Sequence, residues 1–488
     1  MTELPPSAAE SSAVSPPQVR HPRLPLRFRL RALGIEQALR LAWCFLGLAL
    51  AEVAGRPVDW VVDADRRDAR RAARRAAGAR RVAATLGQLK GPFAKAGQFA
   101  SLRYDLLAPE VREAFATLQD RVPPLPFRSV AAVIEAELGA PVEALFASFE
   151  PEPLGAASVA QVHRARLPNG EDVAVKVQFP WLEHSLRADL ALAGGLLARL
   201  GRQRLSPIDR RRLFQEFAVG LAEELDFRHE ADVAAEIAAN LAHDPQVVVP
   251  SVHRALSARR VLTVGYLPAI PITDRDALAR RGVPVRAVLE TLARAYAKQV
   301  FVDGLFHADP HPGNLFVVDD DEVAVRPRVL FVDFGLSKRL SPRLRREMRG
   351  GIHALLRQDV GGFVDAMERM NMIAAGARDG VQAAVVSMFE RIRREGALLG
   401  LGGAQVLGLK DEAKRLLAET PGLQLPNELL LYAKTLSFLF GLGEFLDPQA
   451  DLMRISVPYL LRFLAERDGS ARGAPLSGAG GGAGPAGG

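Results

Sequence analysis

The chain has 488 residues, with 63 Lys and Arg against 56 Asp and Glu, which gives a formal net charge of +7. Hydrophobic residues make up 49% and charged residues 24%, proportions that exclude a mainly disordered chain. Cys44 is the single cysteine, which excludes an intramolecular disulfide framework and a cysteine-based zinc cluster. The basic balance indicates an anionic partner, which could be a nucleotide, a nucleic acid or an anionic lipid.

The N-terminus and the apolar runs bear on targeting. Residues 1–25 start with Ser, Ala, Pro and two glutamates, which predicts a disordered segment and not a signal peptide. The best apolar run, Leu41–Ala51, is short, and Leu429–Gly443 is interrupted by Lys434, whereas a spanning helix needs about 20 residues. We therefore expect no transmembrane helix and a cytoplasmic protein, with peripheral contact at the inner face of the cell membrane as an alternative. A membrane-surface helix around Gly34–Val53 fits the same residues.

Arginines are concentrated between residues 66 and 81, and their spacing places most of them on one face of a helix. A solvated face is the plainest interpretation, and a surface for anionic lipid is the second. Nucleic acid is the third, but no aromatic side chains lie between the arginines, so we expect no nucleic-acid partner. The residues are Arg66, Arg67, Arg70, Arg71, Arg74, Arg75, Arg80 and Arg81.

A strand-rich segment begins near Phe149. Pro168-Asn169-Gly170 predicts a hairpin turn between strands at about Ser158–Leu167 and Glu171–Gln178. Helical periodicity resumes over Glu183–Leu241, and the chain is mostly helical after Asp274. A strand-rich lobe followed by a helical lobe predicts a cleft, where nucleotides often bind.

The segment His307–Asn314 carries the first candidate for catalysis. Asp309 can orient a hydroxyl or accept its proton, and the side-chain carbonyl of Asn314, five residues later, can bind magnesium. A predicted strand, Val329–Val332, then ends at Asp333-Phe334-Gly335, where the carboxylate is a second magnesium ligand. His-x-Asp-x4-Asn followed by Asp-Phe-Gly is the spacing of kinase catalytic and metal loops.

Lys176 lies on the second strand of the predicted hairpin, in Val-Ala-Val-Lys, where a lysine can reach the α- and β-phosphates of a nucleotide. Alone this would be an ordinary edge strand, but its position before the other two motifs favours an ATP lysine. A run of four carboxylates offers it a partner, and Glu230 shares a helical face with Glu223 and with Asp226. The alternative for this run is a solvated acidic face.

Two features depart from the protein-kinase pattern. Gly155, Ala156, Ala157 and Ser158 stand where a kinase has its glycine-rich loop, so this loop should be stiffer, although its amides can still bind phosphate. No Ala-Pro-Glu follows Asp333, so we do not expect a platform for peptide substrates.

Together these motifs resemble the UbiB/AarF family of atypical kinase-like proteins, the bacterial relatives of the mitochondrial coenzyme Q kinase-like proteins. The similarity covers about residues 85–450. Further segments that carry it are Lys95-Ala96-Gly97-Gln98, Leu118–Pro124, Ala160–Ala165, Glu224–Ala231, Leu425-Pro426 and Leu446-Asp447-Pro448.

The resemblance implies an α+β, predominantly helical, bilobal protein-kinase-like fold with an N-terminal helical extension. The implied segments are a disordered N-terminus (1–25), the helical extension (26–125), an N-lobe (126–267), a C-lobe (268–468) and a disordered Gly-rich tail (469–488).

The resemblance also implies the site. Lys176 would be the ATP lysine and Glu230 its helix partner, and Asp309 would be the catalytic-loop aspartate. Asn314 and Asp333 would hold Mg²⁺, and residues 155–158 would bind ATP.

A lid is implied as well. Lys95 and Gln98 of the extension would fold over the active site, where Lys95 would meet Glu224 and Asp226. Such a lid occupies the space that a protein substrate needs.

Three positions depart from the family pattern. Gly155 stands in place of a first alanine, Gly265 in place of a hinge glutamate, and Val233 in place of an asparagine after the acidic motif. The change at the hinge leaves adenine to backbone groups, so the nucleotide preference stays open.

The resemblance implies, as the leading hypothesis, a Mg²⁺-dependent ATPase, or a small-molecule or lipid kinase, that supports isoprenoid quinone (ubiquinone) biosynthesis or lipid metabolism, with a quinone precursor or lipid as partner. A nucleotide-binding scaffold without turnover is one alternative. A protein or antibiotic kinase is the other.

Overall fold

The computed structural model describes residues 35–89, 91–101, 114, 124–200, 207–394, 416 and 419–466. The predicted disordered ends, 1–25 and 469–488, and the segment 118–123 lie outside the described residues. The chain forms two compact units. Unit 1 comprises residues 1–101, 110–228 and 252–266, and unit 2 comprises residues 102–109, 229–251 and 267–488.

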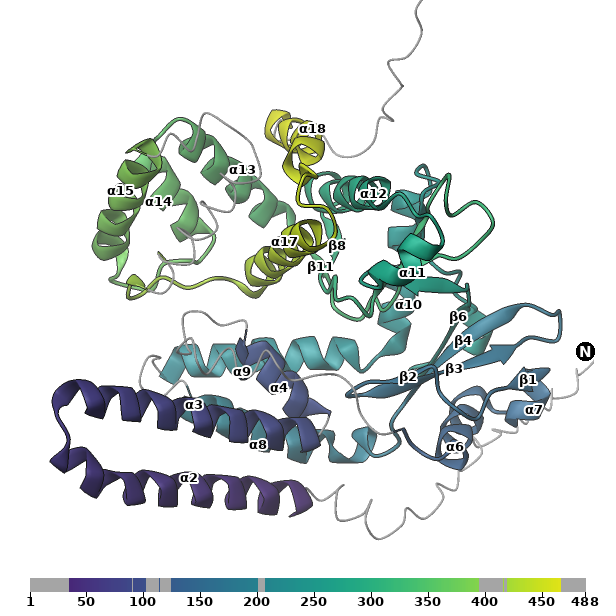
Figure 1. The fold of residues 1–488 in the computed structure, drawn as a ribbon, viewed down its shortest axis with the longest axis horizontal. Coiled ribbons are helices and arrows are strands. Elements are labelled where there is room, and N and C mark those ends of the chain that lie inside the picture. The colour runs from purple at the N-terminus through teal and green to yellow at the C-terminus, as the bar shows by residue number, and fades with distance from the viewer. Residues whose placement is uncertain are drawn as a thin grey trace, which may run out of the picture. The chain divides into compact units, whose positions relative to one another are not determined.

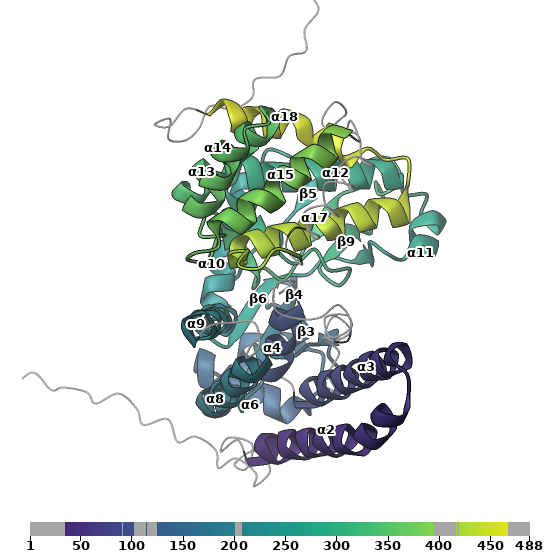
Figure 2. The ribbon, with the colours of Figure 1, turned by 90° about the vertical axis from the view of Figure 1, so that its left-hand side faces the viewer.

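Unit 1 begins with a helical hairpin. Helices α2 (Ile35–Val61) and α3 (Ala64–Leu89) run side by side (Figures 1 and 2). The short helix α4 (Pro92–Ser101) packs against α3, α8 (Leu182–Leu200) and α9 (Pro207–Glu224).

The sheet of unit 1 is antiparallel and has the order β1-β3-β4-β6, with β2 paired to the N-terminal part of β3. The predicted hairpin is confirmed, with Gly170 in the left-handed conformation (φ +89°) that the turn requires. Apolar side chains of β4 alternate inward and pack against helix α6, whereas Lys176 lies on the opposite face. The elements are β1 (Ser148–Phe149), β2 (Gly155–Ala156), β3 (Ala160–Arg166), β4 (Asp172–Gln178), β6 (Val261–Gly265), α6 (Phe127–Leu138), α7 (Val142–Leu145) and η1 (Arg254–Leu256).

Unit 2 contains two small sheets. The first has the order β5-β10-β9-β7, and the second pairs β8 with β11. These strands carry the segments that the sequence singled out, because β8 leads into Asp309 and β10 leads into Asp333. The strands are β5 (Val247–Val248), β7 (Ala269–Pro271), β8 (Leu305–His307), β9 (Leu315–Val318), β10 (Val329–Phe331) and β11 (Ser337–Arg339).

Helices enclose these strands within unit 2 (Figure 1). One core cluster joins Phe306 and Ala308 to Leu431 and Phe463, and a second joins α14 to α15. Helix α10 (Phe227–Leu241) has its first two residues in unit 1 and the rest in unit 2. The other helices are α11 (Arg275–Arg280), α12 (Val285–Ala297), the π-helix η2 (Lys298–Asp303), α13 (Pro342–Leu356), α14 (Val360–Arg369), α15 (Arg378–Arg394), α17 (Asn427–Leu446) and α18 (Leu452–Ala465).

The prediction that no helix could cross a membrane is wrong. Residues Ile35–Pro57 of α2 (23 residues) and Asn427–Leu446 of α17 (20 residues) are long and apolar enough to do so. The uninterrupted apolar runs in the sequence are short, but a helix of this length tolerates single charges such as Arg40, Glu52 or Lys434. The predicted cytoplasmic location, with peripheral membrane contact as its alternative, is therefore withdrawn. The finding concerns only the length and the apolar composition of these two helices, and a buried core helix can have the same length and composition.

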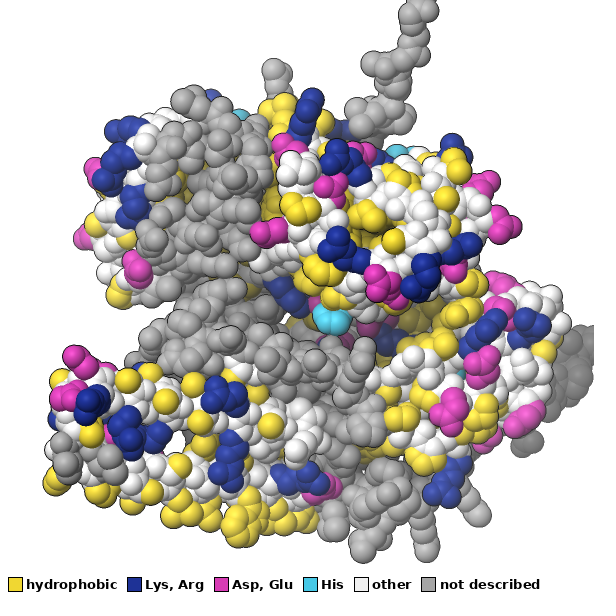
Figure 3. All heavy atoms as spheres, viewed as in Figure 1, with side chains coloured by type: hydrophobic (Ala, Val, Ile, Leu, Met, Phe, Trp, Pro, Cys, Tyr) yellow, Lys and Arg dark blue, Asp and Glu magenta, His cyan; other side chains and the backbone are white. Residues whose placement is uncertain are grey.

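The outer face of α2 is apolar. Two tryptophans on it are among the most exposed large side chains, Trp43 at 70% and Trp60 at 87%. Figure 3 shows hydrophobic side chains along the edge of this helix. The face turned to α3 carries the buried Leu41 and Cys44 instead.

Candidate functional site

The loop that carries Asp309 is held by its own backbone. Strand β8 ends at His307, and β9 starts directly after Asn314. The amide of His311 donates to the carbonyl oxygen of Asp309 (2.6 Å), and the amide of Asn314 donates to the carbonyl oxygen of His311 (2.8 Å). Pro310 and Pro312 fix φ within the loop. The side chains at its two ends are thus brought together.

Asn314 and Asp309 are in direct contact. The side-chain Nδ2 of Asn314 donates to the backbone oxygen of Asp309 (3.1 Å) and approaches its Oδ2 (3.4 Å). Because the nitrogen of the Asn314 side-chain amide is turned toward Asp309, its oxygen is turned away from Asp309.

Asp333 lies at the neighbouring strand end. The amide of Val332 donates to the carbonyl oxygen of Asn314 (3.0 Å), because β10 pairs with β9 in antiparallel register. Asp333 itself has φ +61°, a conformation that is uncommon for a residue other than glycine and that marks functional sites. The amide of Gly335 approaches its Oδ1 (3.4 Å).

Asn314 and Asp333 fit a magnesium site. Both offer hard oxygen ligands, and Mg²⁺ is usually held by one or two carboxylates together with substrate phosphates and water. Within the described residues there is no cluster of three or more His, Cys, Asp or Glu side chains that could hold a metal on its own. The donor set therefore suits a metal that arrives with phosphate.

His307 connects the two loops. Its ring is fully buried, and Nε2 donates to the carbonyl oxygens of Asp333 (2.9 Å) and Val332 (3.2 Å). The hydroxyl of Tyr296 lies 3.1 Å from Nδ1, to which it donates in this tautomer. Burial lowers the pKa of His307, so the ring is neutral and the tautomer is fixed.

Two supporting residues were missed from the sequence. The first is Tyr296, which contacts the ring of His307. The second is Gln299, which is buried and whose side-chain Oε1 accepts a hydrogen bond from the backbone amide of His307 (2.9 Å). Gln299 lies in the π-helix η2, which has no spacing signature, so no motif could have identified it.

Lys434 is a further residue of the site that no sequence motif identified. Its Nζ lies 2.7 Å from Oδ1 of Asp309 and comes from α17, 125 residues away. The sequence showed this lysine only as an interruption of an apolar run.

In unit 1, Lys176 lies on β4 between Val162 of β3 and Leu262 of β6. Its Nζ stands 5.1 Å from the centre of the Phe227 ring, within cation–π range. Glu230 is buried and lies in the first turn of α10, one turn after Phe227. Because Lys176 belongs to unit 1 and Glu230 to unit 2, their assigned pairing stays a prediction, as does the cleft.

The alanine-rich loop is a tight connection between β2 and β3. The amide of Ala157 donates to the carbonyl oxygen of Ala160 (2.8 Å). The carbonyl oxygen of Ser158 accepts the amide of Gly91 (3.1 Å), directly before α4. The loop assigned to phosphate is thus bonded to the segment assigned as the lid.

Helix α4 brings Lys95 to α9, where its Nζ lies 2.5 Å from Oε1 of Glu224, and both side chains are largely buried. Asp226 accepts two side-chain hydrogen bonds and the backbone amide of Arg228, and these contacts lower the pKa of its carboxyl group. The side chain of Gln98 lies outside the described part of the chain.

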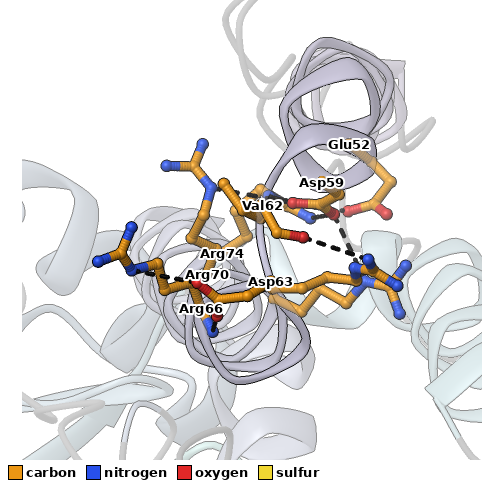
Figure 4. A network of polar contacts seen from close by, with 9 residues as sticks. Glu52, Asp59, Val62, Asp63, Arg66, Arg70 and Arg74 are labelled. Carbon is orange, nitrogen blue, oxygen red and sulfur yellow. Dashed lines mark hydrogen bonds and ion pairs between the residues drawn. The ribbon is translucent and has the colours of Figure 1, made fainter.

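The arginine face is used partly inside the protein. Asp59 of α2, 3% exposed, accepts hydrogen bonds from Arg74 and Arg71, and Arg70 lies 3.9 Å from it (Figure 4). The bonds from Arg74 hold the pKa of the Asp59 carboxyl below its usual range. Several of the arginines thus tie α3 to α2, and contact of the others with anionic lipid stays a prediction.

Comparisons with known proteins agree with the motifs. The family described as "ABC1 atypical kinase-like domain" matches residues 117–367. A "Probable protein kinase UbiB" from Marinobacter nauticus is 34% identical over 80% of this chain and 70% of its own. One from Pseudomonas paraeruginosa is 32% identical over 91% and 80%.

Among solved structures, the complex of Rv3197 with erythromycin from Mycobacterium tuberculosis is 25% identical, with a TM-score of 0.48, and the match covers 76% of this chain and 90% of that one. The family model and the UbiB relatives confirm the family resemblance inferred from the sequence, and with the observed helices and sheets they confirm the α+β, predominantly helical, kinase-like fold.

Proposed function

Since the chain belongs to the family of ABC1 atypical kinase-like proteins that includes UbiB, we propose that it binds ATP with Mg²⁺ and cleaves the terminal phosphate. The observation that carries this proposal is the joining of Asp309, Asn314 and Asp333 at two neighbouring strand ends through His307.

The proposed step is a displacement at the γ-phosphorus. The oxygen of water, or of a small acceptor hydroxyl, forms a bond to phosphorus while the bond to the β–γ bridging oxygen breaks and ADP leaves. Asp309 accepts the proton of the attacking hydroxyl. Mg²⁺, held by Asn314 and Asp333, would neutralise charge on the phosphates.

Unit 1 would supply the remaining contacts. Lys176 would bind the α- and β-phosphates, and the amides of residues 155–158 would face the phosphates. The ion pair between Lys95 and Glu224 supports α4 as a lid, which favours water or a small acceptor over a protein substrate. The resemblance to the UbiB/AarF family implies that the acceptor, or the pathway that the protein regulates, belongs to isoprenoid quinone biosynthesis or lipid metabolism.

The test is ATP turnover by the full chain and by Asp333→Asn, with ATP binding measured in parallel. We expect Asp333→Asn to lose at least about 100-fold in kcat, because charge stabilisation of this kind contributes about 10²–10³ in rate. Parental turnover in Asp333→Asn would refute the catalytic assignment.

A scaffold without turnover makes a different prediction. The purified parent would then show no more ATP hydrolysis than Lys176→Ala. To identify the pathway, metabolites of a deletion strain would be profiled for a lost quinone or an accumulated precursor, with the parental gene restored as the control.

A further inference from the structure

A lysine far along the sequence reaches the proposed catalytic aspartate. Lys434 of α17 approaches Oδ1 of Asp309 to 2.7 Å, while Asn314 approaches Oδ2 from the other side (3.4 Å). The Asp309 side chain is therefore held at both oxygens by groups from two different elements.

Packing fixes the turn of α17 that carries this lysine. Leu431 belongs to the same buried cluster as Phe306 and Ala308, the residues on either side of His307. The ring of Tyr432 meets that of Phe306 edge to face, with 6.2 Å between centroids. The helix is thus anchored on the strand that leads into Asp309, and the ion pair is not a chance contact of two surface side chains.

The exposure of the pair fits a functional position. Lys434 is 36% exposed and Asp309 is 19% exposed, so both reach solvent. The segment 307–314 contains no lysine or arginine of its own, and the positive charge beside Asp309 is brought by α17. A proton acceptor must be held within hydrogen-bonding reach of the attacking hydroxyl, and small misplacements are costly to the rate.

We propose that Lys434 is a positioning residue of the catalytic centre, which fixes the Asp309 carboxylate in the orientation that it needs to accept the proton. The inference rests on the proposed function, in which Asp309 is that acceptor. It adds α17 to the elements that build the site.

The experiment compares ATP turnover of the full chain with Lys434→Met, Lys434→Arg and Arg454→Met. We expect Lys434→Met to lower kcat about 10- to 100-fold with KM for ATP within about threefold, because misplacement by about 1 Å costs up to 10²-fold and the proposed role of Lys434 is to orient Asp309 and not to bind ATP. Lys434→Arg should restore most of the rate. Arg454→Met, which removes an exposed charge from the neighbouring α18, should equal the parent.

A purely structural role would give another pattern. Lys434→Met would then lower the melting temperature, its effect on turnover would follow the fraction unfolded, and at a temperature where all variants are folded its kcat would equal that of the parent. Such a result would overturn the inference.

The double variant with Asp309→Asn separates this inference from the function on which it rests. If the two residues act as a unit, Lys434→Met should cause little further loss in the Asp309→Asn background. Full turnover in Asp309→Asn alone would refute the role of Asp309 in the proposed function. Loss in Asp309→Asn with parental kcat in Lys434→Met would refute only the role of Lys434.

Discussion

The buried ring of His307 donates from Nε2 to the carbonyl oxygen of Asp333 across 2.9 Å, so that one side chain joins the loop of Asp309 to the loop of the proposed metal ligand. The hydroxyl of Tyr296 completes the contacts of the ring on its other nitrogen. A proton on Nδ1 would make the ring a buried imidazolium, and burial disfavours that charged form by lowering the pKa of His307. The junction therefore requires a neutral histidine.

This requirement predicts the pH dependence of unit 2. Burial lowers the pKa of His307 in the folded chain, whereas an unfolded histidine titrates near about 6.5. Its contribution to stability is therefore complete above about pH 6.5 and declines as the pH falls toward the folded pKa, because only the unfolded chain takes up the proton. Replacing His307 with Gln should flatten this decline. Hydrogen exchange of amides in α12 and β8, corrected for intrinsic rates, would measure it.

His163 provides the control in unit 1. Burial also lowers its pKa, and its Nδ1 lies 2.8 Å from the carbonyl oxygen of Glu150. His163→Gln should flatten the decline for amides of β3 and β4 and leave that of unit 2 unchanged. An unaltered pH profile of unit 2 in His307→Gln would contradict the assignment.

Motif spacing in the sequence pointed to the residues that we propose bind or react, but not to the residues that contact them. Asp309, Asn314 and Asp333 lie close together in the chain and follow a known spacing, so motif logic could find them. Tyr296, Gln299 and Lys434 act through tertiary packing. Which groups they touch depends on how the helices fold back on the strands, and no local sequence pattern encodes that.

The same distinction explains the errors outside the site. The spacing of the arginines predicted a helical face, and α3 has that face. Its partner Asp59 lies on the preceding helix, and nothing in the sequence indicated that three arginines would converge on it. The prediction that the chain has no membrane-length helix was wrong because it counted uninterrupted apolar runs and did not allow for single charges inside a helix.

Asp59 should hold the hairpin together. In Asp59→Asn the group that gathers Arg70, Arg71 and Arg74 loses its charge, and we expect α2 to open more often, with amide exchange in α2 accelerated about 10-fold or more. Asp63→Asn is the matched control, since Asp63 pairs with the exposed Arg66 and an asparagine can still cap α3. Equal exchange in the two variants would argue against the clamp.

Two glycines near the phosphate loop should respond in opposite ways to alanine. At Gly155 an added Cβ meets no atom within 4 Å, and φ is not positive, so Gly155→Ala should stabilise unit 1 by about 0.4–1 kcal/mol through the unfolded state. Gly91 has φ +54°, and its Cβ would lie 2.8 Å from Leu182, so Gly91→Ala should destabilise by more than about 1 kcal/mol. Urea midpoints of the two variants measure the difference. A loss at Gly155 as large as that at Gly91 would contradict this prediction.

The lid assignment can be tested through its ion pair. Because Lys95 and Glu224 are largely buried, a double-mutant cycle with Lys95→Met and Glu224→Gln should give a coupling energy of about 1–3 kcal/mol in unfolding. The exposed pair of Asp226 and Arg228 provides the comparison, where the coupling should be below about 1 kcal/mol.

The same variants test what the lid does. If α4 excludes protein acceptors, Lys95→Met should raise the transfer of radiolabelled phosphate from ATP to a protein acceptor. Glu224→Gln should raise this transfer to a similar extent, because both changes break the same ion pair. Strong coupling in stability with no gain in transfer from either variant would make the pair a structural contact of α4 and α9. A gain in Lys95→Met alone would instead assign the effect to the lysine and not to closure of the lid.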